Sequence, residues 1–294
     1  MPLGNQSAPT GLNGEPTDPG FAHVGQVNNS TGVYLGHGWV LTADHVGAGT
    51  FTLGGVNYGF DGVNSQQVGG ADLRLFKLTS NPLLAPLKLA TTSPAINNPV
   101  VMIGAGRSPT SDTATTWFVD EGPDPWVWDT SFFSAEDGTK SGYPTNSTRA
   151  VRWGTNSVDG LSTDLSYSVG SKSYNDMDAL FTDFDQNDGT AFESQAVTND
   201  SGSGLFIDHG AGWELAGTIV TVGTFPGQPG GNNGASTAVF GNLTYAIDLS
   251  AYADTINGIV PEPATTGLLV GLLALAGTLT KRRIRVLAEI WPRR

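Results

Sequence analysis

Residues 39–45 read WVLTADH and decide the fold of this chain: a short apolar run leads directly into a histidine. In two later stretches, residues 71–78 (ADLRLFKL) and residues 199–206 (NDSGSGLF), the polar residue comes first and the apolar run follows it. Short apolar runs bounded by glycine and polar residues are typical of buried β-strands. Each stretch therefore places one reactive side chain at the end of a strand, in the order His45, Asp72, Ser201.

These three residue types together can carry out acyl transfer. A serine hydroxyl becomes nucleophilic at neutral pH only when a neighbouring base takes its proton, and a buried carboxylate holds that base in one tautomer. The three stretches supply a base, a carboxylate and a hydroxyl, one in each stretch. The pattern predicts a catalytic site made of His45, Asp72 and Ser201.

The same stretches resemble the trypsin-like (chymotrypsin-fold) serine proteases of bacterial type. That family has tryptophan, two apolar residues and Thr-Ala-Ala-His before its base, and only Asp44 departs from it here. Its aspartate directly precedes an apolar strand, as Asp72 does, and its nucleophile lies in Gly-Asp-Ser-Gly-Gly-Pro. The resemblance implies that His45 is the base, Asp72 orients it, Ser201 attacks, and the backbone N–H groups of Asn199 and Ser201 form the oxyanion hole.

The resemblance also implies a substrate cleft. Residues 215–221 (LAGTIVT) match the strand along which extended substrate pairs, so Val220 and Thr221 are expected to bind substrate. Gln195, six residues before Ser201, falls at the floor of the primary specificity pocket. An uncharged residue there argues against a strict preference for arginine or lysine.

Three departures from the family pattern lead to expectations of their own. Asp44 adds a carboxylate next to the base, which would favour the protonated imidazole. Asn199 replaces a glycine, but asparagine tolerates the left-handed backbone better than most residues, so the oxyanion hole is expected to survive. Residues 21–25 (FAHVG) only faintly resemble the N-terminus that activation cleavage creates in the family. We expect no such cleavage and another partner for Asp200.

Composition agrees with an all-β fold. The 294 residues include 40 glycines and 17 prolines, as expected for many short strands joined by turns. The prediction is two six-stranded antiparallel β-barrels over residues 21–258, joined by a linker at residues 82–99. The second barrel opens at residues 100–106, and Asp248 caps a C-terminal helix over residues 249–256. The tryptophans between residues 112 and 164 are interpreted as packing rather than as a binding groove.

Charge excludes one class of partner. The net charge is −13 with 14% charged residues, so a nucleic-acid partner is not expected. The chain has no cysteine, and no cofactor or metal is predicted. Residues 183–189 (DFDQNDG) nearly fit a calcium loop but are better interpreted as a solvated acidic loop.

The C-terminal residues carry a candidate sorting signal. Residues 260–263 read VPEP, an apolar run over residues 264–280 could span about 25 Å as a helix, and KRR follows at residues 281–283. This order resembles the PEP-CTERM sorting signal of Gram-negative bacteria, here residues 259–284. It implies a single apolar helix in the membrane, an exosortase-like sorting enzyme as partner, and a cytoplasmic tail at residues 285–294. The alternative is a plain membrane anchor.

The N-terminal residues do not match the export that a sorting signal requires. Residues 1–20 have neither a basic start nor an apolar stretch, so no signal peptide is visible. We interpret them as a flexible leader and expect the start of the gene to be truncated. The expected location is the cell envelope or extracellular matrix of a Gram-negative bacterium.

These observations predict a secreted or surface-sorted serine endopeptidase acting on polypeptides. The alternative is a catalytically inactive protease-fold protein that serves as an adhesin or matrix-binding module, and Asn199 is the residue that supports it. An esterase is a weaker possibility because Gly-x-Ser-x-Gly is absent at Ser201.

Overall fold

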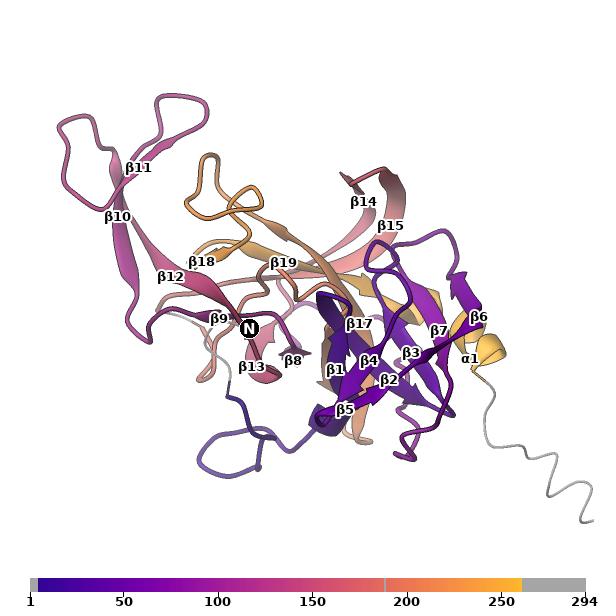
Figure 1. The fold of residues 1–294 in the computed structure, drawn as a ribbon. Coiled ribbons are helices and arrows are strands. Elements are labelled where there is room, and N and C mark those ends of the chain that lie inside the picture. The colour runs from indigo at the N-terminus through magenta and orange to yellow at the C-terminus, as the bar shows by residue number, and fades with distance from the viewer. Residues whose placement is uncertain (1–4, 188, 261–294) are drawn as a thin grey trace, which may run out of the picture.

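The computed structural model describes residues 5–187 and 189–260 and confirms the all-β class, with 47% strand and 5% helix. Two curled sheets, as in the chymotrypsin fold, make up most of the molecule (Figure 1). The predicted sorting signal and cytoplasmic tail lie almost entirely outside the described residues. Within those residues, no helix has the length and apolarity needed to cross a membrane.

The first sheet has seven antiparallel strands where six were expected. Their order is β5 (Val56–Tyr58), β4 (Phe51–Leu53), β1 (Val24–Val27), β2 (Ser30–Gly36), β3 (Trp39–Thr42), β7 (Arg74–Leu78) and β6 (Phe60–Gln67). Strands β4 and β5 form a two-residue hairpin. Gly54 and Gly55 both have positive φ, 56° and 80°, which this tight turn requires.

The second sheet also has seven antiparallel strands. Their order is β13 (Arg152–Ser157), β8 (Pro99–Gly104), β16 (Gly204–Asp208), β17 (Trp213–Gly223), β19 (Leu243–Asp248), β15 (Lys172–Asp183) and β14 (Gly160–Val169). Strand β8 begins where the second set of strands was predicted. The last two strands at one edge, β15 and β14, form a long hairpin that extends beyond the sheet toward the first one (Figure 1).

A third sheet of five strands was not predicted. It contains β11 (Val127–Asp129), β10 (Thr115–Asp120), β12 (Gly138–Arg149) and β18 (Thr237–Val239), with β9 (Arg107–Pro109) paired to β12. Trp117, Trp126 and Trp128 pack here with Phe225, whose ring stacks on Trp126 at 5.6 Å. These tryptophans therefore form a small core, as interpreted from the sequence.

The main core lies between the two large sheets, and strand β3 shows how the sequence builds it. Side chains alternate across a strand, so Trp39 and Leu41 point into the core between the sheets while Val40 points into a second core within the first sheet. All four residues of β3 are buried. A strand covered on both faces holds its end rigidly, and the turn carrying His45 follows directly.

Both ends of the domain differ in detail from the prediction. Residues 5–20 were expected to be flexible, but Asn5 pairs with Trp153 through two backbone hydrogen bonds of 3.1 Å, and the Trp213 indole donates to Thr17 at 2.7 Å. Asp248 caps the predicted helix through the Ser250 N–H at 2.9 Å. The segment is divided into a 3-10 turn, η2 (Leu249–Ala251), and a short helix, α1 (Ala253–Ile259). One more 3-10 turn, η1 (Phe21–His23), precedes β1.

Candidate active site

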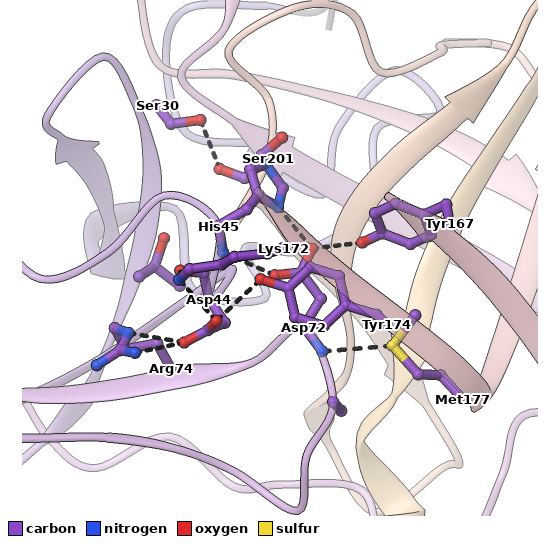
Figure 2. Close-up of polar contacts among 12 residues, drawn as sticks. Ser30, Asp44, His45, Asp72, Arg74, Tyr167, Lys172, Tyr174, Met177 and Ser201 are labelled. Atoms are coloured by element: carbon purple, nitrogen blue, oxygen red, sulfur yellow. Dashed lines mark hydrogen bonds and ion pairs between the residues drawn. The ribbon is translucent and has the colours of Figure 1, made fainter. Parts of the chain in front are cut away.

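His45 follows strand β3 and is held by Asp72 through two contacts. Its Nδ1 lies 2.5 Å from Asp72 Oδ2, and its backbone N–H donates to Asp72 Oδ1 at 2.8 Å. Because an ionised carboxylate only accepts hydrogen bonds, the proton lies on Nδ1 and Nε2 is the free basic nitrogen. The ring lies between Ser201 and Asp72 (Figure 2).

Asp72 is fully buried in the turn before strand β7. Besides the two groups of His45, the Tyr167 hydroxyl donates to Oδ2. The backbone N–H of Asp72 donates to the Met177 sulfur at 3.3 Å. The carboxylate is thus shielded from water but served by three hydrogen-bond donors, which is what a buried charge needs in order to persist.

Ser201 lies in a tight turn before strand β16. The turn is anchored to β17 by the N–H of Gly202, which donates to the Ile219 carbonyl at 2.7 Å, and to β2 by the Ser201 carbonyl, which accepts from the Thr31 N–H at 3.0 Å. Gly202 has φ 89°, and a Cβ on it would come within 2.1 Å of the Thr31 carbonyl. Only glycine fits at this position, which explains the Ser-Gly pair in the sequence.

The peptide bond between Thr198 and Asn199 has one clear orientation. The Thr198 carbonyl accepts from the Arg107 N–H at 3.3 Å, so the N–H of Asn199 points the opposite way, as a trans peptide requires. Throughout residues 5–187 and 189–260, no group accepts a hydrogen bond from the N–H of Asn199 or of Ser201. Two backbone donors close to the Ser201 hydroxyl are therefore free to bind an oxygen.

Asn199 takes the place of a glycine by adopting a glycine-like conformation, with φ 77°. Its side chain is anchored at both ends: the amide nitrogen donates to the Asn29 carbonyl at 2.5 Å, and the amide oxygen accepts from Arg107 Nε at 3.3 Å. Its backbone carbonyl accepts from the Thr31 hydroxyl at 3.0 Å. These contacts offset the cost of the left-handed backbone, which is small for asparagine.

Asp200 is buried and accepts two backbone hydrogen bonds, from the Gly106 N–H at 2.8 Å and the Val197 N–H at 3.0 Å. A Cβ on Gly106 would come within 2.4 Å of this carboxylate. The carboxylate thus has backbone partners within the folded domain, in line with the expectation that it does not depend on a newly cleaved N-terminus.

His45 and Ser201 line the same cleft, which has a volume of about 260 Å³. Val220 and Thr221, predicted to bind substrate, also line it. Gln195 does not: it is fully buried, and neither polar atom of its amide has a hydrogen-bond partner within the described part of the chain. The next two residues along the chain, Ala196 and Val197, line the cleft instead.

Asp44, the departure from the family pattern, is buried and turned toward cations. Arg74 donates to Oδ1 through Nε at 2.8 Å, Lys172 lies 2.7 Å from Oδ2, and the Tyr174 hydroxyl donates to Oδ2 at 2.8 Å (Figure 2). Burial raises the pKa of the Asp44 carboxyl, but the hydrogen bonds of Lys172 and Tyr174 and the charge of Arg74 outweigh it, so the pKa lies below its ordinary value. Its charge is thus compensated locally rather than by the imidazole.

Sequence reasoning missed the residues that β14 and β15 contribute. Tyr167, Lys172 and Tyr174 reach the turns around His45 and Asp72 from 95 to 130 residues away along the chain. Tyrosines in a polar hairpin carry no local signal for such a role. The one sequence feature that points to these residues is Asp44, because a carboxylate directly after a predicted buried strand needs partners for its charge.

No metal site is apparent in the part of the chain that the structure describes, where no group of three or more histidine or acidic side chains could hold an ion. Four residues after the acidic segment of residues 183–189, the carboxylate of Glu193 accepts a hydrogen bond from the Thr190 N–H at 2.8 Å. Burial raises the pKa of Glu193 to about 7. This residue lies apart from the cleft.

Comparison with known proteins identifies solved structures with a similar fold. No protein-family model and no curated protein matches the chain. The MamO protease domain of Magnetospirillum magneticum in its apo form is 12% identical, with a TM-score of 0.46 over 81% of this chain and 97% of that one. Neuropsin, a serine protease of mouse brain, is 13% identical, with a TM-score of 0.49 over 88% of this chain and 99% of that one. Kallikrein-related peptidase 10 is 15% identical, with a TM-score of 0.48 over 83% of this chain and 98% of that one. These neighbours are trypsin-like serine proteases, and the likeness concerns the fold alone.

Proposed function

We propose that this protein is a serine endopeptidase whose catalytic residues are His45, Asp72 and Ser201. The observation that carries the proposal is the cleft: it is lined by Ser201 and by an imidazole that is hydrogen-bonded to a fully buried carboxylate. Two backbone N–H groups without acceptors lie in the same turn as the serine. A structural role for these residues would not require donors left free at that point.

The proposed reaction follows the transfer of one proton between Ser201, His45 and the leaving amine. Ser201 Oγ attacks the carbonyl carbon of the scissile peptide while His45 Nε2 takes the hydroxyl proton, and the N–H groups of Asn199 and Ser201 bind the resulting oxyanion. Asp72 stays ionised and stabilises the imidazolium. His45 then gives the proton to the leaving amine, which breaks the C–N bond and leaves an ester on Ser201. Water, deprotonated by His45, hydrolyses that ester to the acid and restores the serine.

The cleft favours an uncharged substrate side chain. The ionisable residues that line it are His45, Tyr167 and Asp200, and the Asp200 carboxylate is occupied by the N–H groups of Gly106 and Val197. The rest of the lining is uncharged and consists of apolar, hydroxyl and amide side chains, among them Ala196, Val197, Ile219, Val222, Asn232 and Asn233. We expect cleavage of a peptide library after small or medium uncharged residues. A clear preference for arginine or lysine would contradict this.

The decisive experiment is labelling of the full chain with a fluorophosphonate probe, which reacts only with an activated serine. The parent protein is expected to be labelled and Ser201→Ala is not, because the nucleophile is gone. Ser141→Ala, the same chemical change on β12, serves as the matched control and should label like the parent. If the folded parent is not labelled, the inactive binding-module alternative is favoured.

We further propose export and sorting through residues 259–284, on the order of the VPEP motif, the apolar run and the basic cluster in the sequence. Mass spectrometry of the protein isolated from its cell envelope tests this proposal. Removal of the residues after the motif would support a sorting signal, and an intact membrane-bound C-terminus would indicate a plain anchor.

A further inference from the structure

The hydroxyl of Tyr167 occupies a place that the catalytic scheme above leaves unexplained. It donates to Asp72 Oδ2, the oxygen that also accepts from His45 Nδ1 (Figure 2). Tyr167 comes from strand β14 of the second sheet, whereas His45 and Asp72 belong to the first. A contact across the two halves of the domain thus ends on the one oxygen that orients the base.

Tyr167 is suited to this contact because it stays neutral. Burial and the nearby Asp72 charge raise the pKa of its hydroxyl above the ordinary value, so it remains a proton donor at neutral pH. A neutral donor stabilises a carboxylate and fixes its rotation without cancelling its charge. The charge therefore remains available to the imidazolium that forms during catalysis.

The hairpin that carries Tyr167 is anchored at the same turns. Tyr167 and Tyr174 are directly opposite each other in the β14–β15 ladder, with ring centroids 5.7 Å apart. Tyr174 and Lys172 are bound to Asp44, and Met177 accepts the Asp72 N–H. Four residues of one hairpin thus contact the two turns that hold His45 and Asp72, so the tyrosine ring has little freedom to move away.

We propose that Tyr167 is a positioning residue of the proposed serine protease: it holds Asp72 so that Oδ2 faces His45 Nδ1, which in turn directs Nε2 into the cleft toward Ser201. The inference rests on the proposed function. Tyr167 also lines the cleft together with Ser168 and Val169, so the same hairpin borders the cleft that His45 lines.

The test compares Tyr167→Phe with Tyr245→Phe in the full chain. Tyr245 lies on β19 of the same sheet and packs on Phe181, and its hydroxyl has no partner in the part of the chain that the structure describes. Saturation kinetics with the fluorophosphonate should show the maximal labelling rate of Tyr167→Phe lowered about tenfold, the value of one hydrogen bond to a charged group. The half-saturating probe concentration should stay within about twofold of the parent.

The pH dependence of labelling separates positioning from a general structural effect. Without the Tyr167 hydroxyl, the Asp72 charge is less dispersed and favours the protonated imidazole, so the rise of the rate with pH should move to higher pH. The other charged and titratable groups around the pair are Asp44, Arg74, Lys172 and Tyr174, and both variants leave them unchanged. Tyr245→Phe should keep the parental profile.

Three results would overturn the inference: an unchanged maximal rate, an unchanged pH profile, or a loss confined to the half-saturating concentration. If Tyr167→Phe does not fold, fluorotyrosine incorporated at position 167 strengthens the donor instead, and the profile should move to lower pH. If the parent is never labelled, the proposed function fails by itself. The proton NMR signal of His45 Nδ1–H then tests the contact alone, since it should shift in Tyr167→Phe and not in Tyr245→Phe.

Discussion

The β14–β15 hairpin serves two buried carboxylates in contrasting ways. Asp44 is bound by two cations, Arg74 and Lys172, in addition to the hydroxyl of Tyr174. Asp72 lies two residues before Arg74, yet within the described residues no arginine or lysine forms an ion pair with it. Its donors are the backbone N–H and imidazole of His45 and the hydroxyl of Tyr167.

The difference shows what each carboxylate can do. A carboxylate paired with two cations has its charge cancelled, so it can hold structural elements together but has little effect on a third group. A carboxylate served by neutral donors keeps its charge and can stabilise an imidazolium beside it. The Asp44 cluster, which consists of Asp44, Arg74, Lys172 and Tyr174, therefore holds the hairpin in place. The charge of Asp72 remains available to stabilise the His45 imidazolium.

The largest effect that would test this contrast is expected from Asp72→Asn. The fluorophosphonate labelling rate should fall about 10⁴-fold, because a neutral amide favours the wrong tautomer of the base. The matched change Asp44→Asn should cost the labelling rate less than about tenfold, since Asp44 acts through the fold. Comparable losses in the two variants would show that the carboxylates do not have separate roles.

Asp44→Asn should instead affect stability. It leaves Arg74 and Lys172 without their counter-charge, and we expect the free energy of unfolding at pH 7 to fall by about 2–3 kcal/mol. This figure is below that for a fully buried pair because the Lys172 side chain is 42% exposed. Urea unfolding followed by tryptophan fluorescence measures it. A change below about 0.5 kcal/mol would mean that the cluster does not fasten the hairpin.

Low pH should remove the stabilisation that the Asp44 carboxylate provides. The pKa of Asp44 is lower in the folded protein than in the unfolded chain, so its stabilisation is complete above the ordinary aspartate value and disappears as the pH falls through the folded value. The stability difference between the parent and Asp44→Asn should therefore be constant between pH 7 and 5 and shrink below about pH 4. A difference that persists at the most acidic pH tolerated by both proteins would contradict the assignment.

The smallest effect is expected from Lys172→Met, which removes the more exposed of the two cations while keeping the apolar stem. Unfolding should become easier by only about 0.5–1 kcal/mol, as for other partly exposed ion pairs. The labelling rate should stay within about twofold, because Tyr167 and Tyr174 keep their contacts. A labelling loss as large as that of Asp72→Asn would place Lys172 in the electrostatics of the base.

The parts of the site that could be predicted from sequence are those encoded by adjacent residues. The apolar run before His45, the strand after Asp72 and the glycine after Ser201 each carry a local requirement, burial on both faces or room for a positive φ. Gln195 was misplaced because its predicted location depended on counting residues through a turn. The third sheet was missed because the pairing of a long strand such as β12 depends on partners up to a hundred residues away.

The sequence by itself thus determined the all-β class, the three candidate catalytic residues and their order, and the left-handed tolerance needed at Asn199. Only the tertiary structure decided that His45 and Asp72 meet, that the 198–199 peptide leaves its N–H free, and that Asp44 and Asp72 have different partners. The physical reason is the distance along the chain between the residues that decide each property. Strand formation and backbone conformation follow from neighbouring residues, whereas the charge state of a buried carboxylate depends on which side chains a distant hairpin brings to it.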